Sequence, residues 1–131
     1  MLILDTCALV FDALDPMRLS KKAAVVIAQA HDAGTIACCD ISLWEIAMLV
    51  SKRRLNPGTD SQTFIQLVLT ARNIKVLPIT AEIAARSALP EFCLHGDPAD
   101  RIIAASTILH KSKLVTSDQK LATVIGLQIV W

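Results

Sequence analysis

Four acidic residues that lie far apart in the sequence occupy positions where their carboxylates could meet. Asp5 and Asp118 each follow a short apolar run that is typical of a strand in a parallel sheet covered by helices on both faces. Ligands bind beyond the carboxyl ends of such strands. Glu45 lies one turn into the helix predicted after the second strand, and Asp100 lies in the first turn of the helix before the strand that precedes Asp118. The pattern predicts an acidic site at one edge of the sheet.

Converging carboxylates would favour one kind of chemistry. Two charges about 4 Å apart repel by ~4 kcal/mol at an effective dielectric of 20, so the cluster would need a cation. Ligation by carboxylate oxygens selects Mg²⁺ or Mn²⁺ over zinc, and these ions activate water and neutralise charge on a phosphate. The acids therefore predict a metal-dependent phosphodiesterase or phosphatase.

Each acid also has a structural interpretation. Asp5 and Asp118 could cap the helices that follow them, and Asp100 could serve a helix N-terminus. Glu45 is harder to explain in this way, because its helix is apolar all round and is therefore expected to be buried. A buried carboxylate needs a partner. At this point both interpretations stay open.

The elements that must position these acids alternate between strand and helix along the chain. We expect strands at residues 1–4, 35–40, 74–77, 113–116 and 127–130. We expect helices at residues 7–11, 21–33, 40 or 42 to 50, 62–72, 80–89, 98–110 and 119–125. The clearest helix start has Asp97 at the N-cap and Pro98 at the first helical position. Residues 1–131 are thus predicted to form one three-layer α/β/α domain around a parallel sheet of four to five strands.

The sequence also indicates a shared face on one helix, and His31 of that helix is expected to be a surface residue. Ser20 can cap the helix at 21–33, and Gly34 can end it. The residues expected to share one face of that helix are Ala23, Ala24, Ile27, Ala28 and His31. His110 is expected at a helix surface.

Composition excludes several classes of protein. The chain has 13 basic and 12 acidic residues, so no overall positive field attracts a nucleic acid, and any RNA contact must come from local patches. Mean hydropathy is high at +0.51, yet no apolar run reaches the ~18 residues of a membrane span. The start lacks the basic residues of a secretory signal, which predicts a cytoplasmic protein with no membrane association.

The cysteines do not have the spacing of a zinc site. Cys38 and Cys39 are adjacent, whereas Cys7 and Cys93 stand far from any paired ligand. We expect all of them to be buried, reduced thiols.

Four motifs together resemble those of the PIN-domain family, and within it the VapC toxins of prokaryotic type II toxin-antitoxin modules. The motifs read LDTCAL at residues 4–9, DISLWEIA at 40–47, HGDPADRIIAA at 95–105 and LVTSD at 114–118. The resemblance covers essentially the whole chain and keeps the order and spacing of the family. Ser106 and Thr107 depart from it, because a more aliphatic stretch is common there, and this affects packing rather than chemistry.

The resemblance implies a small endoribonuclease that depends on Mg²⁺ or Mn²⁺. Asp5, Glu45, Asp100 and Asp118 stand at the acidic positions of the family. Asp5 and Asp100 would hold the principal ion directly, and Asp118 and Glu45 would complete the site directly or through water. Thr6 or Thr116 would correspond to the hydroxyl often found beside these acids. Asp97 is assigned first to helix capping, and His95 is expected to be an exposed loop residue rather than a general base.

The resemblance also implies partners. RNA would be the substrate, with tRNA a common target among such proteins, and a VapB-type antitoxin would silence the toxin and connect it to DNA only indirectly. Arg101, Lys52, Arg53 and Arg54 are candidates for RNA backbone contacts, although the last three could equally form a solvated helix end. The chain has only five aromatic residues, so base stacking is expected to contribute little. A homodimer is also implied, and its interface could use Phe64, Leu67 and Val68.

Competing functions make distinct demands on the sequence. A receiver domain needs two adjacent acids after its first strand, and a dehalogenase-type phosphatase needs a second Asp two residues after its nucleophile. Thr6 and Cys7 follow Asp5, which disfavours both. Another metal-dependent phosphatase stays open, as does a non-catalytic RNA- or protein-binding module, although such a module is expected to lose at least one of the four acids.

Overall fold

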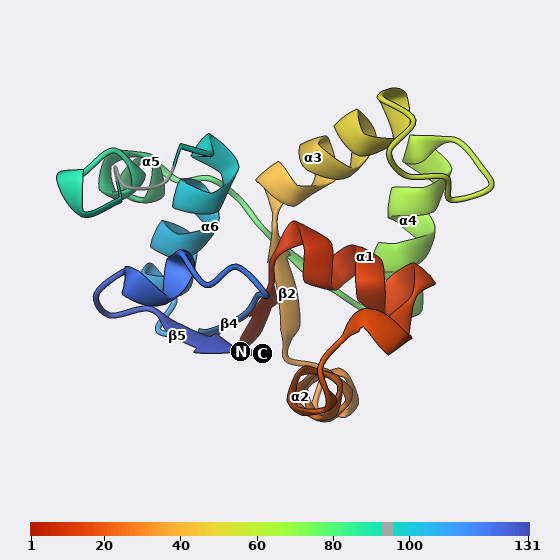
Figure 1. The fold of residues 1–131 in the computed structure, drawn as a ribbon, viewed down its shortest axis with the longest axis horizontal. Helices are drawn as coiled ribbons and strands as arrows, with labels where there is room; N and C mark the ends of the chain where they lie inside the picture. Colours follow the sequence, from red (N-terminus) through yellow and green to blue (C-terminus); the bar gives the residue numbers. More distant parts are fainter. Residues whose placement is uncertain (93–95) are drawn as a thin grey trace.

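A parallel sheet forms the centre of the molecule. The computed structural model describes residues 1–92 and 96–131. In that described part, five strands pair in the order β3-β2-β1-β4-β5 (Figure 1). The strands are β1 (Leu2–Leu4), β2 (Ile36–Cys39), β3 (Lys75–Leu77), β4 (Lys113–Val115) and β5 (Gln128–Val130). The chain adds strands on both sides of β1, so the carboxyl end of β1 is the topological switch point, where parallel sheets bind ligands.

Both faces of the sheet are covered by apolar packing. Leu2 and Leu4 belong to one buried cluster, while Ile3 between them belongs to the other. Cys38 and Cys39 divide between the clusters in the same way, because successive strand residues point to opposite faces. The predicted three-layer α/β/α fold is confirmed.

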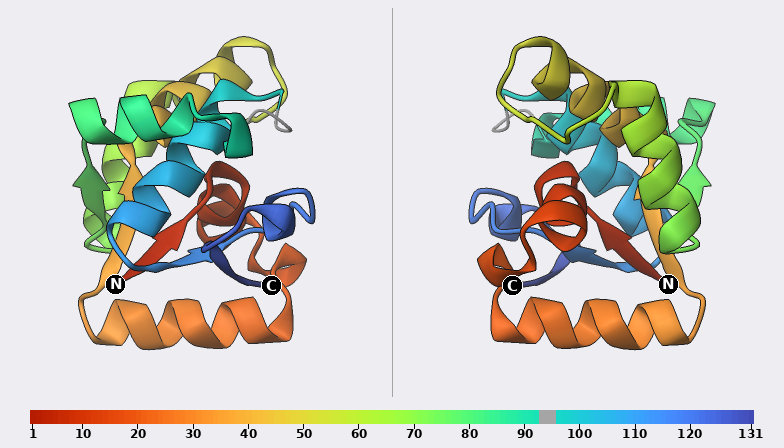
Figure 2. Two further views of the ribbon diagram at one scale, coloured as in Figure 1. Left: turned by 90° about the vertical axis from the view of Figure 1, so that its left-hand side faces the viewer. Right: turned by 90° about the vertical axis from the view of Figure 1, so that its right-hand side faces the viewer.

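Helices from the first half of the chain cover one face, and those from the second half cover the other (Figure 1). The first group comprises α1 (Thr6–Leu14), α2 (Lys21–Asp32), α3 (Asp40–Ser51) and α4 (Ser61–Ala71). The second comprises α5 (Ala81–Ser87) and α6 (Pro98–Leu109). Three short 3-10 turns complete the described elements: η1 (Pro16–Arg18), η2 (Pro90–Phe92) and η3 (Leu121–Thr123). Figure 2 shows α2 running alongside the sheet, with the two chain termini near its opposite ends.

Side-chain caps fix where several helices begin. Asp5, Ser20 and Asp60 each accept a hydrogen bond from the backbone amide three residues later. Asp97 accepts one from the amide of Ala99 at 2.9 Å. These bonds satisfy amides that have no partner inside the helix, so the predicted starts of α2, α4 and α6 are confirmed.

One prediction about local structure is wrong. Residues 119–125 were expected to form a helix, but only the single turn η3 forms. The carboxylate of Asp118 accepts the amide of Lys120 at 2.9 Å, which makes a tight turn, and the β-branched residues that follow disfavour a helix. On α2, the residues that reach the core are Ala23, Ile27 and Ala30, whereas Ala24 and Ala28 are exposed.

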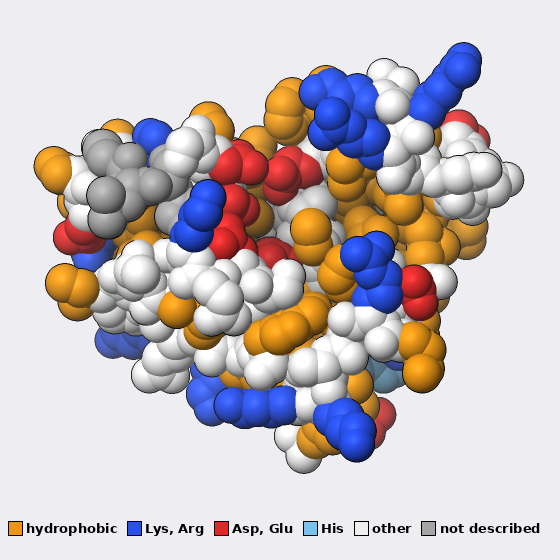
Figure 3. All heavy atoms as spheres, viewed as in Figure 1, with side chains coloured by type: hydrophobic (Ala, Val, Ile, Leu, Met, Phe, Trp, Pro, Cys, Tyr) orange, Lys and Arg blue, Asp and Glu red, His pale blue; other side chains and the backbone are white. Residues whose placement is uncertain are grey.

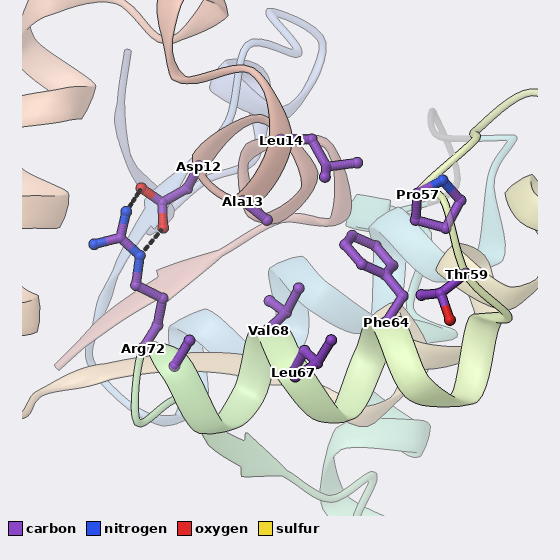
Figure 4. A pocket seen from close by; sticks show the side chains of 10 residues that line it. Asp12, Ala13, Leu14, Pro57, Thr59, Phe64, Leu67, Val68 and Arg72 are labelled. Carbon is purple, nitrogen blue, oxygen red and sulfur yellow. Dashed lines mark hydrogen bonds and ion pairs between the residues drawn. The ribbon is translucent and has the colours of Figure 1, made fainter.

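The helices α3 and α4 also differ from expectation. In α3 only Ser42 and Ile46 are buried, and the side chain of Trp44 is 59% exposed, so the helix is not enclosed on all sides. In α4, Phe64 and Val68 are core residues that face α1, which leaves Leu67 as the exposed member of the predicted interface (Figure 4). The apolar surface of this helix is thus mostly used inside the chain.

The cysteines are buried at two of the three described positions. Cys38 and Cys39 lie in the core, where burial raises their pKa values to about 12 and about 11. Cys7 is exposed, contrary to prediction, because the first turn of α1 points it away from the sheet. Cys93 lies outside the described residues.

Among the described residues, no helix combines the length and apolar character needed to cross a membrane.

Candidate active site

The end of β1 and the end of β4 hold two of the predicted acids side by side. The backbone amide of Asp5 donates to the carbonyl of Val115 at 3.1 Å, which ties the two strand ends together. The buried hydroxyl of Thr116 donates to the carboxylate of Asp5 and accepts the backbone amide of Asp118 at 3.1 Å. A single threonine therefore links both acids.

The surroundings of Asp5 disfavour the charged form of its carboxyl group. Burial raises its pKa above the ordinary value, and the negative charge of Asp118 raises it further. Hydrogen bonds from the Thr116 hydroxyl and the Ala8 amide act in the opposite direction. The balance stays on the raised side, because burial outweighs these hydrogen bonds.

Glu45 reaches the same edge from α3. Thr6, the residue after Asp5, donates its hydroxyl proton to Oε1 of Glu45 and lies 3.0 Å from the hydroxyl of Ser42. One hydroxyl carries one proton, so Ser42 must be the donor in its bond with Thr6 when Glu45 is ionised. The result is a chain of polar groups, from Ser42 through Thr6 to Glu45, that joins α3 to the end of β1.

The pKa of Glu45 is also raised. Burial is the largest cause, and the charges of Asp97 and Asp5 add to it, whereas the hydrogen bond from Thr6 lowers it. Asp97 caps α6, as predicted, and its charge also reaches the acidic edge.

The exposed thiol of Cys7 shows where Asp100 lies. Partial desolvation by the surrounding residues raises the pKa of Cys7 to about 11, and the charges of Asp5, Glu45 and Asp100 raise it further, in that order. Asp100 is therefore close to the same space as the other acids.

The acidic side chains at this edge offer the type of ligand atom that a hard divalent cation prefers. Figure 3 shows Asp and Glu side chains gathered where this face of the molecule is hollowed, between the side of α6 and the side of α3. All are oxygen donors, the type preferred by Mg²⁺ and Mn²⁺. Across residues 1–92 and 96–131, no three His, Cys, Asp or Glu side chains are already arranged to hold an ion.

The fold and these residues have a family counterpart. The sequence profile of the PIN domain matches residues 2–127. The chain belongs to the PIN-domain family. It is 31% identical over 119 residues to Ribonuclease VapC22 of Mycobacterium tuberculosis, covering 91% of this chain and 88% of that protein. This PIN domain is thus of the VapC type.

Solved structures show the same fold in related complexes. VapBC2 from Rickettsia felis, bound to a DNA fragment of its promoter, matches with a TM-score of 0.75 and 19% identity, covering 98% of this chain and 96% of that chain. DNA-bound VapBC from Salmonella typhimurium matches with a TM-score of 0.70 and 15% identity over 98% and 96% of the two chains. At these identities the likeness establishes the fold.

The predicted acids and hydroxyls of this PIN domain lie together, and of the predicted cations only Arg101 lies beside them. Lys52, Arg53 and Arg54 are exposed at the end of α3. Seven residues separate Glu45 from Lys52, a helical rise of about 10 Å. Arg101 is half-buried on α6, next to Asp100, and His95 lies outside the described residues.

Sequence reasoning missed two polar groups of the site. Ser42 was considered only as a helix start, although its position three residues before Glu45 places both on one face of α3. Arg18 was not considered at all. Its guanidinium lies 4.2 Å from the ring centre of Phe11, and its positive charge lowers the pKa of Cys7, so it provides a cation near that thiol. No sequence signal marked Arg18, because its place depends on the turn after α1.

Proposed function

We propose that this PIN domain is a metal-dependent endoribonuclease that acts as the toxin of a VapBC-type toxin-antitoxin pair. The observation that carries the proposal is the linked set of carboxylates at the carboxyl edge of the sheet, in a chain 31% identical to Ribonuclease VapC22. The substrate would be an RNA phosphodiester, with tRNA one candidate.

Asp5, Asp100, Asp118 and Glu45 would hold Mg²⁺ or Mn²⁺. When bound, the ion would activate water and neutralise charge on the scissile phosphate. The protein contributes the orientation of its acids: Thr116 fixes Asp5 relative to Asp118, and Thr6 fixes Glu45. Raised pKa values at Asp5 and Glu45 mean that both carboxylates gain from a nearby cation.

Cations outside the acidic hollow would bind the RNA backbone. Lys52, Arg53 and Arg54 form an exposed group at the end of α3, and Arg101 stands beside the acids on α6. Figure 3 shows Lys and Arg side chains gathered over α3, apart from the acidic hollow. Such contacts position a substrate without reading its sequence.

The partner would be a VapB-type antitoxin, as in the VapBC complexes that share the fold. An antitoxin that binds the folded toxin would stabilise the inactive complex by mass action. DNA binding would come through the antitoxin. We also propose a homodimer, to which exposed apolar residues such as Leu67 could contribute.

The first test compares the wild-type protein with Asp100→Asn on total cellular RNA, each with Mg²⁺, with Mn²⁺ and with EDTA. We expect discrete products that require metal and disappear in the variant, because the substitution removes a charged ligand. Sequencing the product ends would identify the target RNA. Asp32→Asn is the matched control, because this exposed acid ends α2 far from the site, and its products should be unchanged.

Equal inactivity of both proteins, together with no Mn²⁺ binding by calorimetry, would contradict the proposal. The acids would then be structural, and a non-catalytic RNA- or protein-binding module would be the better interpretation. Release of phosphate from monoesters without RNA cleavage would instead indicate a phosphatase.

A second prediction concerns the Thr6 hydroxyl. Thr6→Val keeps the shape of the side chain but removes the donor to Glu45, so we expect cleavage and Mn²⁺ affinity to fall by roughly tenfold. Thr6→Ser keeps the hydroxyl and should retain most of both. Cleavage assays and calorimetry on the two variants provide the measurement. Wild-type Mn²⁺ affinity in Thr6→Val would show that Thr6 does not support the metal site.

A further inference from the structure

An apolar cavity of about 510 Å³ lies between the first turns of α3 and α6. It is lined by Ile41 and Trp44 from α3, and by Asp97, Pro98 and Ala99 at the start of α6. The side chain of Trp44 is 59% exposed, which leaves much of the indole surface open to solvent. A cavity of this size suits a small planar ligand.

The cavity adjoins the proposed catalytic acids. Trp44 immediately precedes Glu45, and Asp97 is close enough to Glu45 for its charge to raise the pKa of that carboxyl. Asp100 lies one turn beyond Asp97 on α6. If a phosphate of an RNA substrate reached these acids, the nucleoside attached to that phosphate would therefore lie near the cavity.

Trp44 differs from the other aromatic residues in being available to a ligand. Phe64 and Phe92 are buried in the two cores. Phe11 and Trp131 pack against each other, with ring centres 6.4 Å apart. The small number of aromatic residues is thus a poor guide to stacking, because the exposed one lies beside the site.

We propose that this cavity is a nucleobase subsite, in which an RNA base next to the scissile phosphate stacks on the Trp44 indole. The inference rests on the proposed ribonuclease function. The walls favour a base over a phosphate, because they are apolar apart from Asp97, whose negative charge repels phosphate. Base stacking on an aromatic side chain tolerates any sequence, since every base has a π face.

Asp97 adds a chemical preference to the subsite. One carboxylate oxygen already accepts the amide of Ala99 at 2.9 Å, and a carboxylate has further acceptor positions. A base that presents N–H groups, as guanine does with two adjacent donors, would match this acceptor. A purely apolar protein segment in the same place would bury the carboxylate without supplying a donor, which is costly.

Fluorescence can test the stacking directly. The chain has two tryptophans, so Trp131→Phe leaves Trp44 as the single reporter. In EDTA, which prevents metal-dependent cleavage, we would titrate this protein with short single-stranded RNA and with an abasic RNA of the same length. We expect the RNA to quench Trp44 emission and the abasic RNA to quench it much less. Oligonucleotides rich in guanine should quench at the lowest concentration, and Asp97→Asn should weaken that preference.

Substitutions separate stacking from general loss of apolar surface. Trp44→Leu should weaken RNA binding on the order of tenfold, and Trp44→Phe should retain most of it. Val25→Ala is the matched control, because Val25 is 55% exposed but lies on α2, and it should bind RNA like the wild type. Mn²⁺ affinity of Trp44→Leu should be unchanged, which distinguishes lost stacking from a damaged acidic site.

Three results would overturn the subsite. The first is equal quenching by RNA and abasic RNA, and the second is unchanged RNA binding by Trp44→Leu. The third is a pair of observations made without RNA: the Trp44 emission shifts with protein concentration, and the Trp44→Leu variant has a lower oligomeric state than the wild type. Together they would show that a second copy of the chain covers the indole. The proposed function fails separately, if the wild-type protein cuts no RNA in the presence of metal.

Discussion

Asp5→Asn is expected to abolish RNA cleavage and, at the same time, to stabilise the metal-free fold. Loss of a metal-binding carboxylate should lower the cleavage rate by on the order of 100-fold or more. Asparagine can still cap α1 by accepting the amide of Ala8, and it does not bury a charge or face repulsion from Asp118. We expect the free energy of unfolding at neutral pH to rise by about 1 kcal/mol.

The pH dependence of this gain has a definite sign. The pKa of Asp5 is raised by burial and then by Asp118, so the folded state favours the protonated carboxyl. The stability that Asp5 contributes is complete at pH values below its unfolded pKa of about 4, and it is lost as the pH rises through the higher folded pKa. The difference in melting temperature between Asp5→Asn and the wild type should therefore be largest near neutral pH and shrink towards pH ~4.

Thermal unfolding in EDTA at several pH values provides the measurement, and Asp60→Asn provides the control. Asp60 caps α4 in the same way, but it is exposed, and hydrogen bonds from Thr63 lower its pKa. The same substitution there should give no stabilisation and leave cleavage intact. A destabilised Asp5→Asn protein at neutral pH would contradict the electrostatic argument, whatever its activity.

The sheet was predictable from the sequence because its strands are short, apolar and closed by polar residues. Ile3, Ala37 and Leu114 are fully buried, so apolar residues are strongly favoured at their positions. Helix starts were predictable where a capping side chain is present, as at Ser20 and Asp97. The structure of residues 119–125 was not predictable, because the helical pattern there is only seven residues long. The turn held by Asp118 replaces most of that helix.

The candidate site was predictable in its acids but not in the groups that orient them. The strand ends brought Asp5 and Asp118 together by topology alone. The bond between Thr6 and Ser42 joins residues 36 positions apart and depends on how α3 packs against α1. Likewise, the exposure of Trp44 contradicts the apolar pattern of α3, because such a pattern cannot show which apolar residues remain at the surface.

A second large effect is expected at an ion pair that the sequence did not indicate. The guanidinium of Arg72 at the end of α4 binds the carboxylate of Asp12 on α1 through two contacts, at 3.1 and 3.2 Å (Figure 4). The Asp12 side chain is 7% exposed and that of Arg72 is 38% exposed. The pair forms part of the wall of a cavity of about 320 Å³ that Leu14 and Leu67 also line. It therefore holds α4 to α1 beside an open apolar groove.

Arg72→Met should destabilise the fold at neutral pH by about 2 kcal/mol, less than the loss of a fully buried pair because solvent screens the exposed part of Arg72. Burial raises the pKa of Asp12, and Arg72, followed by His31, lowers it. Without the guanidinium the carboxyl is protonated more readily, so the destabilisation should diminish as the pH falls through the pKa of Asp12.

Denaturant unfolding of four proteins would test this pair: wild type, Arg72→Met, Asp12→Asn with Arg72→Met, and Arg86→Met. The double variant should regain part of the lost stability, because it no longer buries an unpaired charge. Arg86 pairs with Glu91 at 3.2 Å, but both side chains are partly exposed, so Arg86→Met should cost less than about 1 kcal/mol. If Arg72→Met cost no more than Arg86→Met at neutral pH, or if its cost did not change with pH, the contribution of Arg72 would be packing of its alkyl chain rather than neutralisation of Asp12.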